Sequence, residues 1–186
     1  MKKIIIVGAS SGIGKQVALN FIADGWKVGV AARREEALKE IKLQIPAQVE
    51  YEVIDITSAD ATSRLNALID KLGGMDIYFH CSGVGHQNTK IDIKVEVDTV
   101  RTNALGFTQM SVAAYNYFKD NKKQGQIAVV SSIAGTKGLG VSPSYSATKR
   151  YNYIYLDCLE QLSRMQNVNI TFTDIRPGFV TTALLD

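Results

Sequence analysis

The chain has 186 residues, of which 46% are hydrophobic and 21% charged, and its formal net charge is +3. This length predicts one domain, and the scattered lysines and arginines argue against a nucleic-acid surface. Cys81 and Cys158 lack the spacing of a disulfide framework, so we expect reduced thiols. The apolar run at 4–7 is too short for a signal peptide, and no stretch approaches transmembrane length. We therefore expect a cytoplasmic protein that binds neither nucleic acid nor membrane.

Strand and helix patterns alternate along the chain. Apolar, β-branched runs predict strands at 4–7, 27–32, 49–54, 77–81, 126–130 and 168–173. Helical patterns lie at 15–23, 35–44, 60–72, 92–118 and 143–165. The alternation indicates the α/β class, with a doubly wound parallel sheet, right-handed crossovers and helices on both faces. The expected Rossmann-type strand order is 3-2-1-4-5-6.

A glycine-rich turn follows the first strand directly and opens a helix. It reads Gly8-Ala9-Ser10-Ser11-Gly12-Ile13-Gly14. Glycines let the backbone approach a pyrophosphate closely, and the helix N-terminus offers free N–H groups. A plain β–α turn is the alternative, but the strand before it and the helix after it favour a dinucleotide-binding loop.

Arg33 and Arg34 follow the second strand, where the adenosine ribose of a bound dinucleotide would lie. An acidic residue there would bind the 2′-hydroxyl, whereas an arginine accommodates a 2′-phosphate. The pair therefore favours NADP(H), with NAD(H) as the second choice. Two solvated arginines that cap the next helix are the competing interpretation.

Two histidines and a cysteine after the fourth strand suggest a metal site at first sight. His80, Cys81 and His86 match no zinc spacing, however, and a fourth ligand is not evident. We predict no metal site, and we expect His80 and Cys81 to line a strand end near the nucleotide.

Several side chains that could act in catalysis or binding lie in the second half of the chain. Tyr145 and Lys149 are four positions apart and so share a helix face, where the ammonium favours tyrosinate and makes the phenol a usable acid or base. Such pairs also occur by chance on surface helices. Ser131 and Ser132 end the fifth strand, at the sheet edge where ligands bind. Asn103 lies inside a predicted helix, which its propensity disfavours, so it needs a surface or functional reason.

Taken in order, these features resemble the short-chain dehydrogenase/reductase family, in its single-domain branch, over the whole chain. The resemblance implies a catalytic tetrad of Asn103, Ser132, Tyr145 and Lys149. Ser132 is preferred to Ser131 because the family's serine stands thirteen residues before its tyrosine. The implied cofactor contacts are Gly8, Ser10, Ser11, Gly12, Ile13, Gly14, Arg33, Arg34, Asp55, Ile56, Gly83, Tyr145, Lys149, Pro177, Gly178, Val180 and Thr182.

The sequence departs from the family pattern in two places. His80-Cys81-Ser82-Gly83 replaces the usual Asn-Asn-Ala-Gly, and only Gly83 matches well, so the hydrogen bonds at that strand end must be made differently. Family members also continue for roughly sixty more residues, within the usual range of domain size. We expect residues 1–186 to form one NAD(P)-binding domain that lacks the substrate-covering segment, with an exposed sixth strand and an open substrate site.

The resemblance implies an NADP(H)-dependent oxidoreductase that moves a hydride between nicotinamide and a small carbonyl or alcohol. Tyr145 would be the general acid or base, Ser132 would bond the substrate oxygen, Lys149 would hold the ribose, and Asn103 would anchor a water. The family also implies a homodimer or homotetramer built through helices 92–118 and 143–165. A non-catalytic nucleotide- or partner-binding protein on the same fold is the alternative. An epimerase or dehydratase fits less well, because of the glycine spacing and the chain length.

Overall fold

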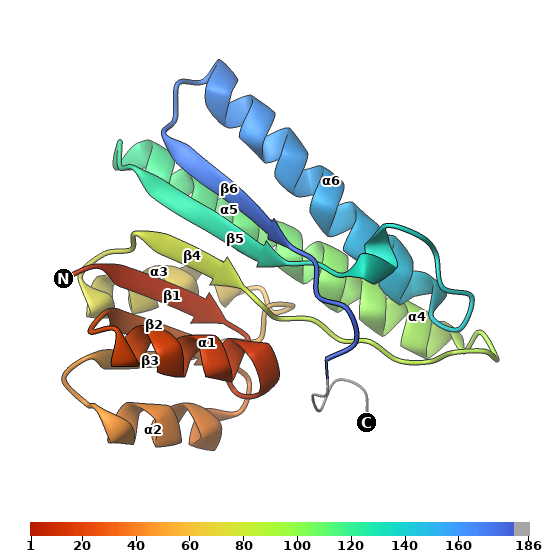
Figure 1. Cartoon of the computed structure of the whole chain (residues 1–186), viewed down its shortest axis with the longest axis horizontal. Helices are drawn as coiled ribbons and strands as arrows, with labels where there is room; N and C mark the ends of the chain where they lie inside the picture. The colour runs from red at the N-terminus through yellow and green to blue at the C-terminus, as the bar shows by residue number, and fades with distance from the viewer. Residues whose placement is uncertain (181–186) are drawn as a thin grey trace.

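The computed structural model describes residues 1–180. Six parallel strands form one sheet in the order β3-β2-β1-β4-β5-β6, and their arrows all point the same way in Figure 1. The strands are β1 (Lys3–Val7), β2 (Lys27–Ala32), β3 (Val49–Val53), β4 (Ile77–His80), β5 (Gly125–Val130) and β6 (Ile170–Ile175). The predicted fold class and strand order are confirmed.

Helices cover the sheet on both faces. They are α1 (Gly12–Ala23), α2 (Glu35–Gln44), α3 (Ala61–Leu72), α4 (Ile93–Val100), the π-helix η1 (Arg101–Gly106), α5 (Phe107–Asp120), the short 3₁₀ turn η2 (Ile133–Gly135) and α6 (Pro143–Met165). Successive strand residues point to opposite faces. Ile4 and Ile6 accordingly join the core under α1 and α2, whereas Ile5 and Val7 join the core under α3, α5 and α6 (Figure 1). This double burial explains why the first strand is apolar throughout.

Two predicted elements differ from the observed ones. The single helix expected at 92–118 is α4, η1 and α5 in succession, because a wide π-turn interrupts the α-helical pattern at Arg101–Gly106. The sixth strand begins at Ile170 rather than at 168. Residues 168 and 169 belong instead to the turn after α6. In this turn Asn167 has a φ of 54°, and the Val168 N–H donates to the Ser163 carbonyl.

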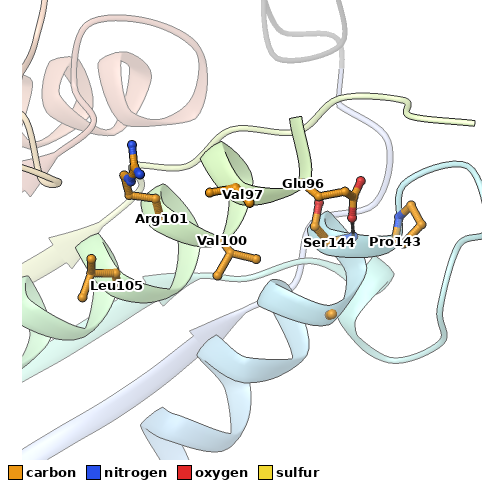
Figure 2. Close-up of a pocket in the computed structure, with 8 residues that line it drawn as sticks. Glu96, Val97, Val100, Arg101, Leu105, Pro143 and Ser144 are labelled. Atoms are coloured by element: carbon orange, nitrogen blue, oxygen red, sulfur yellow. Dashed lines mark hydrogen bonds between the residues drawn. The ribbon is translucent and has the colours of Figure 1, made fainter. Parts of the chain in front are cut away.

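An open groove of about 540 Å³ lies where α4 and η1 meet the start of α6. Figure 2 shows Val97, Val100 and Leu105 along one side of it, with Arg101 and Glu96 also lining it. Leu105 is 57% exposed. Within residues 1–180 no helix combines the length and the apolar character needed to cross a membrane.

Candidate active site

The glycine turn between β1 and α1 has no room for a side chain at Gly8 or at Gly14. Gly8 has a φ of +97°, and a Cβ there would lie 2.6 Å from the Ser82 nitrogen. A Cβ on Gly14 would lie 2.2 Å from the Gly8 carbonyl oxygen. The Ser11 side chain makes no capping hydrogen bond at the start of α1. The turn therefore packs tightly against the chain that follows β4 and leads directly into the N-terminus of α1, an end that favours anions.

Arg34 bridges the two serines of this turn. Its guanidinium donates to Ser10 Oγ at 3.0 and 3.3 Å and to Ser11 Oγ at 2.7 Å. Arg33 is also exposed, and its charge acts on Asp55, which follows β3. The two predicted arginines therefore serve different parts of one surface, Arg34 at the glycine turn and Arg33 toward Asp55.

Asp55 and Ile56 were predicted together as cofactor contacts, and they differ in exposure. Burial works against ionisation of Asp55, but hydrogen bonds from the Thr57 N–H and hydroxyl and the charge of Arg33 outweigh it, so the pKa of Asp55 is lowered. The Ile56 side chain is buried, and it lies where a Cβ on Gly106 would come within 2.8 Å of it. A cofactor contact from Ile56 would therefore come from its backbone.

Tyr145 and Lys149 lie two and six residues into α6. Lys149 is only 6% exposed, its Nζ donates to the Val130 carbonyl at 2.9 Å, and it lies 5.7 Å from the centre of the Tyr145 ring. Burial lowers the pKa of Lys149 to about 8, against the opposing pull of Cys81 and Asp174. An ammonium held beside a phenol in this way can stabilise a tyrosinate.

Asn103 is buried in η1, and its side chain pairs with the loop after β4. Its Oδ1 accepts the Val84 N–H at 2.8 Å, and its Nδ2 donates to the Val84 carbonyl at 2.7 Å. Nδ2 also lies 3.2 Å from the Thr148 hydroxyl, which bonds the Tyr145 carbonyl at 3.0 Å. Through these bonds Asn103 holds the loop that follows β4, where the usual family motif is absent. They also explain why a polar amide is buried inside this helix.

The two serines after β5 have different partners. Ser131 donates from its hydroxyl to the Asp174 carboxylate and lies 3.3 Å from the Ile175 carbonyl, which ties it to β6. Ser132 Oγ accepts the Ala134 N–H at 3.1 Å. An accepting hydroxyl still has its proton to donate. Ser132 is therefore the serine with a donor to offer a ligand, which supports its choice over Ser131.

His80 is the last residue of β4, as expected, and its side chain is buried; its proximity to the nucleotide stays a prediction. His80 is 2% exposed, its Nδ1 pairs with the Tyr78 hydroxyl at 2.8 Å, and its ring meets the Phe107 ring edge to face. Burial lowers its pKa to about 3, with the Lys149 charge adding to the effect. Cys81 is half-buried at the strand end, where burial raises the pKa of its thiol. No cluster of three metal-binding side chains was found among residues 1–180.

The remaining predicted contacts lie around the same edge of the sheet. A Cβ on Gly83 would come within 3.4 Å of both Asn103 Oδ1 and Lys149 Nζ. The Pro177 carbonyl accepts the Ile133 N–H at 3.1 Å, which holds the segment with Gly178 and Val180 beside η2. Thr182 lies outside the described residues.

Sequence reasoning missed three residues of this site. A Cβ on Gly85 would lie 2.9 Å from the Tyr145 ring, so the loop after β4 covers one side of that ring. Thr148 and Asn152 both bond Asn103. The sequence did contain a signal for Thr148 and Asn152: they stand three and seven residues after Tyr145, so their polar side chains share its helix face.

Comparison with known proteins agrees with this arrangement. The family model for short chain dehydrogenases matches residues 2–186. An uncharacterized oxidoreductase of Myxococcus xanthus is 33% identical over 97% of this chain and 72% of its own length. Dehydrogenase/reductase SDR family member 7B of Xenopus tropicalis is 28% identical over 97% of this chain and 62% of its own.

A crystal structure of a variant actinorhodin polyketide ketoreductase with NADPH has the same fold. Its TM-score is 0.88, at 24% identity, and the match covers 98% of this chain and 72% of that one. Against the family member 7B proteins of two Xenopus species and mouse, this chain spans only 58–62% of the relative's length. The family model and the Myxococcus relative settle the classification: this chain belongs to the short-chain dehydrogenase family.

Proposed function

We propose that the protein is an NADP(H)-dependent oxidoreductase that interconverts a small carbonyl compound and its alcohol. The observation that carries the proposal is the buried Lys149 on the Tyr145 face of α6, at the same sheet edge as the glycine turn. Ligands bind at the carboxyl ends of the strands in open α/β sheets. The family membership supports the same reaction class.

The described residues fit a dinucleotide. Gly8 and Gly14 carry no side chain, so the backbone of the turn can approach a ligand closely, and the N-terminus of α1 suits a pyrophosphate. Arg34 is an exposed guanidinium already held by two hydroxyls, and such a group suits a 2′-phosphate in a bidentate contact. Asp55 would take the adenine side, and Lys149 would hold the ribose hydroxyls.

When bound, the dinucleotide would supply a hydride to the carbonyl carbon, or accept one in the reverse direction. In reduction, the Tyr145 hydroxyl donates a proton to the substrate oxygen. The Ser132 hydroxyl donates a hydrogen bond to the same oxygen as negative charge develops on it. The Lys149 ammonium stabilises the tyrosinate that remains, and a water anchored at Asn103 returns the proton through Lys149.

The first test is fluorescence titration of the protein with NADPH and, in parallel, NADH. We expect NADPH to bind at least about tenfold more tightly, and Arg34→Leu to remove most of that preference while NADH affinity changes little. Arg164→Leu, which removes an exposed arginine near the end of α6, is the matched control. Equal affinities for the two cofactors in the wild type would contradict the NADP(H) assignment.

Turnover is then measured on a panel of aldehydes and ketones. Tyr145→Phe should lower kcat by at least about a hundredfold while NADPH binding persists, since proton transfer is worth that much. Tyr153→Phe, on the same helix, controls for loss of a phenol hydroxyl. Full turnover in Tyr145→Phe would remove Tyr145 from the mechanism. Cofactor binding with no turnover across the panel would instead favour a non-catalytic nucleotide-binding protein.

We propose further that the chain acts as one dinucleotide-binding domain and pairs with a second copy through α4, η1, α5 and α6. The exposed apolar side chains on these helices support this: Val97, Val100, Leu105, Val112, Tyr151 and Ile154. Arg101 and Glu96 lie in the same groove (Figure 2), so a two-fold arrangement can oppose unlike charges.

A further inference from the structure

The π-turn at Arg101–Gly106 carries Asn103 and needs support from outside its own helix. π-turns are rare, poorly stabilised by themselves, and frequent at functional sites. This one aims the Asn103 side chain at the loop after β4, where it makes two bonds to Val84. Whatever holds the backbone of Asn103 therefore also holds that loop.

Asn152, on α6, holds the backbone of Asn103 by a hydrogen bond. Its Nδ2 donates to the main-chain carbonyl of Asn103 at 2.7 Å, across 49 positions of sequence, and the bond is buried. Asn152 is itself only 3% exposed. Burying an amide costs free energy unless it is hydrogen-bonded, and a leucine of similar size would fill the site without that cost. An amide at this position is therefore explained by the bond that it makes.

We propose that Asn152 is a positioning residue for the reaction, acting through Asn103; this rests on the proposed function in assigning proton transfer to Tyr145. Asn103 is bonded to α6 twice, by its carbonyl to Asn152 and by its side chain to Thr148. Thr148 in turn bonds the Tyr145 carbonyl. The two attachments fix the register of α6 against η1, and so fix Tyr145 and Lys149 relative to the loop at 83–85.

The test compares Asn152→Leu and Asn152→Asp with Ser163→Ala. Leucine keeps the size and removes the donor, and aspartate keeps the shape and sets an acceptor against the carbonyl. Ser163→Ala removes another hydrogen bond that a buried side chain of α6 makes, to the Glu160 carbonyl, far from the site. Two measurements are made: residue-resolved hydrogen exchange of the Val84 amide, and kcat with the NADPH dissociation constant.

Both Asn152 variants should speed exchange of the Val84 amide by about tenfold or more, because its acceptor on Asn103 is no longer held. They should lower kcat by about tenfold to a hundredfold, as small misplacements of catalytic groups do, with NADPH affinity within about threefold of wild type. Ser163→Ala should change neither measurement.

Three results would overturn the proposal: unchanged Val84 exchange, unchanged kcat, or a loss of NADPH affinity as large as the loss of kcat. The last would mean general damage to the fold. If the wild type turns over no substrate of the panel, the proposed function fails separately. The exchange measurement then still decides whether Asn152 holds Asn103 and its loop.

Discussion

Lys149 is a proposed catalytic residue whose pKa is lowered strongly by the fold. Its ammonium is buried against the Val130 carbonyl, and burial lowers its pKa from 10.5 to about 8. Below pH 8 it is charged in both folded and unfolded chains, so the burial penalty is fully present. Between pH 8 and 10.5 the folded state releases the proton first, so the unfolded state binds more protons and stability rises with pH.

Lys149→Met should therefore show a pH-dependent difference in Tm from the wild type. Below pH 8 the variant gains by losing a buried charge, and this gain should shrink as the pH is raised from 8 to 10. Thermal unfolding of both proteins at several pH values measures it, with Lys119→Met, at an exposed position of α5, as the control for loss of one lysine. A Tm difference that stays constant across this range would show that Lys149 is not perturbed as described.

The candidate catalytic residues could be proposed from the sequence, but their hydrogen-bond partners could not. Tyr145 and Lys149 were predictable because a spacing of four fixes a shared helix face. The division of labour between Ser131 and Ser132 depends on Asp174, forty-three positions from Ser131, which no local pattern reveals. The partners of His80 could not be predicted, because a strand end offers two faces and the one that His80 takes is set by Tyr78 and Phe107.

At the scale of elements, α4 and the loop before it hold the start of α6. The Glu96 carboxylate accepts from Asn88 Nδ2 at 2.7 Å and from the Ser144 N–H, in the first turn of α6, at 3.0 Å. A carboxylate at a helix N-terminus is favoured by the exposed N–H groups and the helix dipole. The Asn88 N–H also bonds the Val141 carbonyl, so the loops at 84–91 and 134–143 are joined beside Tyr145.

Glu96→Ala should lower the free energy of unfolding by about 2 kcal/mol, since it removes two hydrogen bonds to a charged group and leaves a helix N–H without its acceptor. Denaturant unfolding measures this change. Asp98→Ala, on the same helix, removes an exposed carboxylate that pairs with Lys94, and it should have much less effect. Equal losses in the two variants would mean that Glu96 is an ordinary surface charge.

The elements that sequence misjudged are those decided by contacts between helices. Residues 92–118 read as one helix because a π-turn leaves the apolar pattern nearly intact, while Asn152 and Val84, which bond Asn103 within it, are distant in sequence. The β6 boundary moved because Asn167 adopts a positive φ, which asparagine tolerates better than most residues. Strands β1 and β2 were predicted nearly to the residue, since burial on both faces demands an unbroken apolar run.

At the scale of the whole molecule, the parallel sheet brings the candidate site residues together. The glycine turn, the loop at 83–85, Ser132 and the segment after β6 come from four stretches of sequence, and each follows the carboxyl end of a strand. A doubly wound sheet brings those ends to one edge, which is why the site could be outlined before its contacts were known. Among residues 1–180, none of the predicted site residues lies at the opposite ends of the strands.

The proposed pairing of two copies gives the last prediction. A stable interface needs roughly 800 Å² from each partner, more than the groove beside α4 provides alone, so α5 and α6 must contribute. Leu105 is 57% exposed and lines that groove. Leu105→Glu should raise the dimer dissociation constant by at least about tenfold, because a carboxylate would be buried without a partner.

Size-exclusion chromatography with light scattering, over a range of protein concentrations, measures this change. Leu43→Glu is the matched control, because Leu43 is also exposed but lies on α2, away from the proposed interface. Its dissociation constant should equal that of the wild type. A wild type that is monomeric at every concentration would refute the pairing. Equal weakening by both substitutions would refute the chosen surface, and it would leave the apolar side chains of α4, α5 and α6 to another partner.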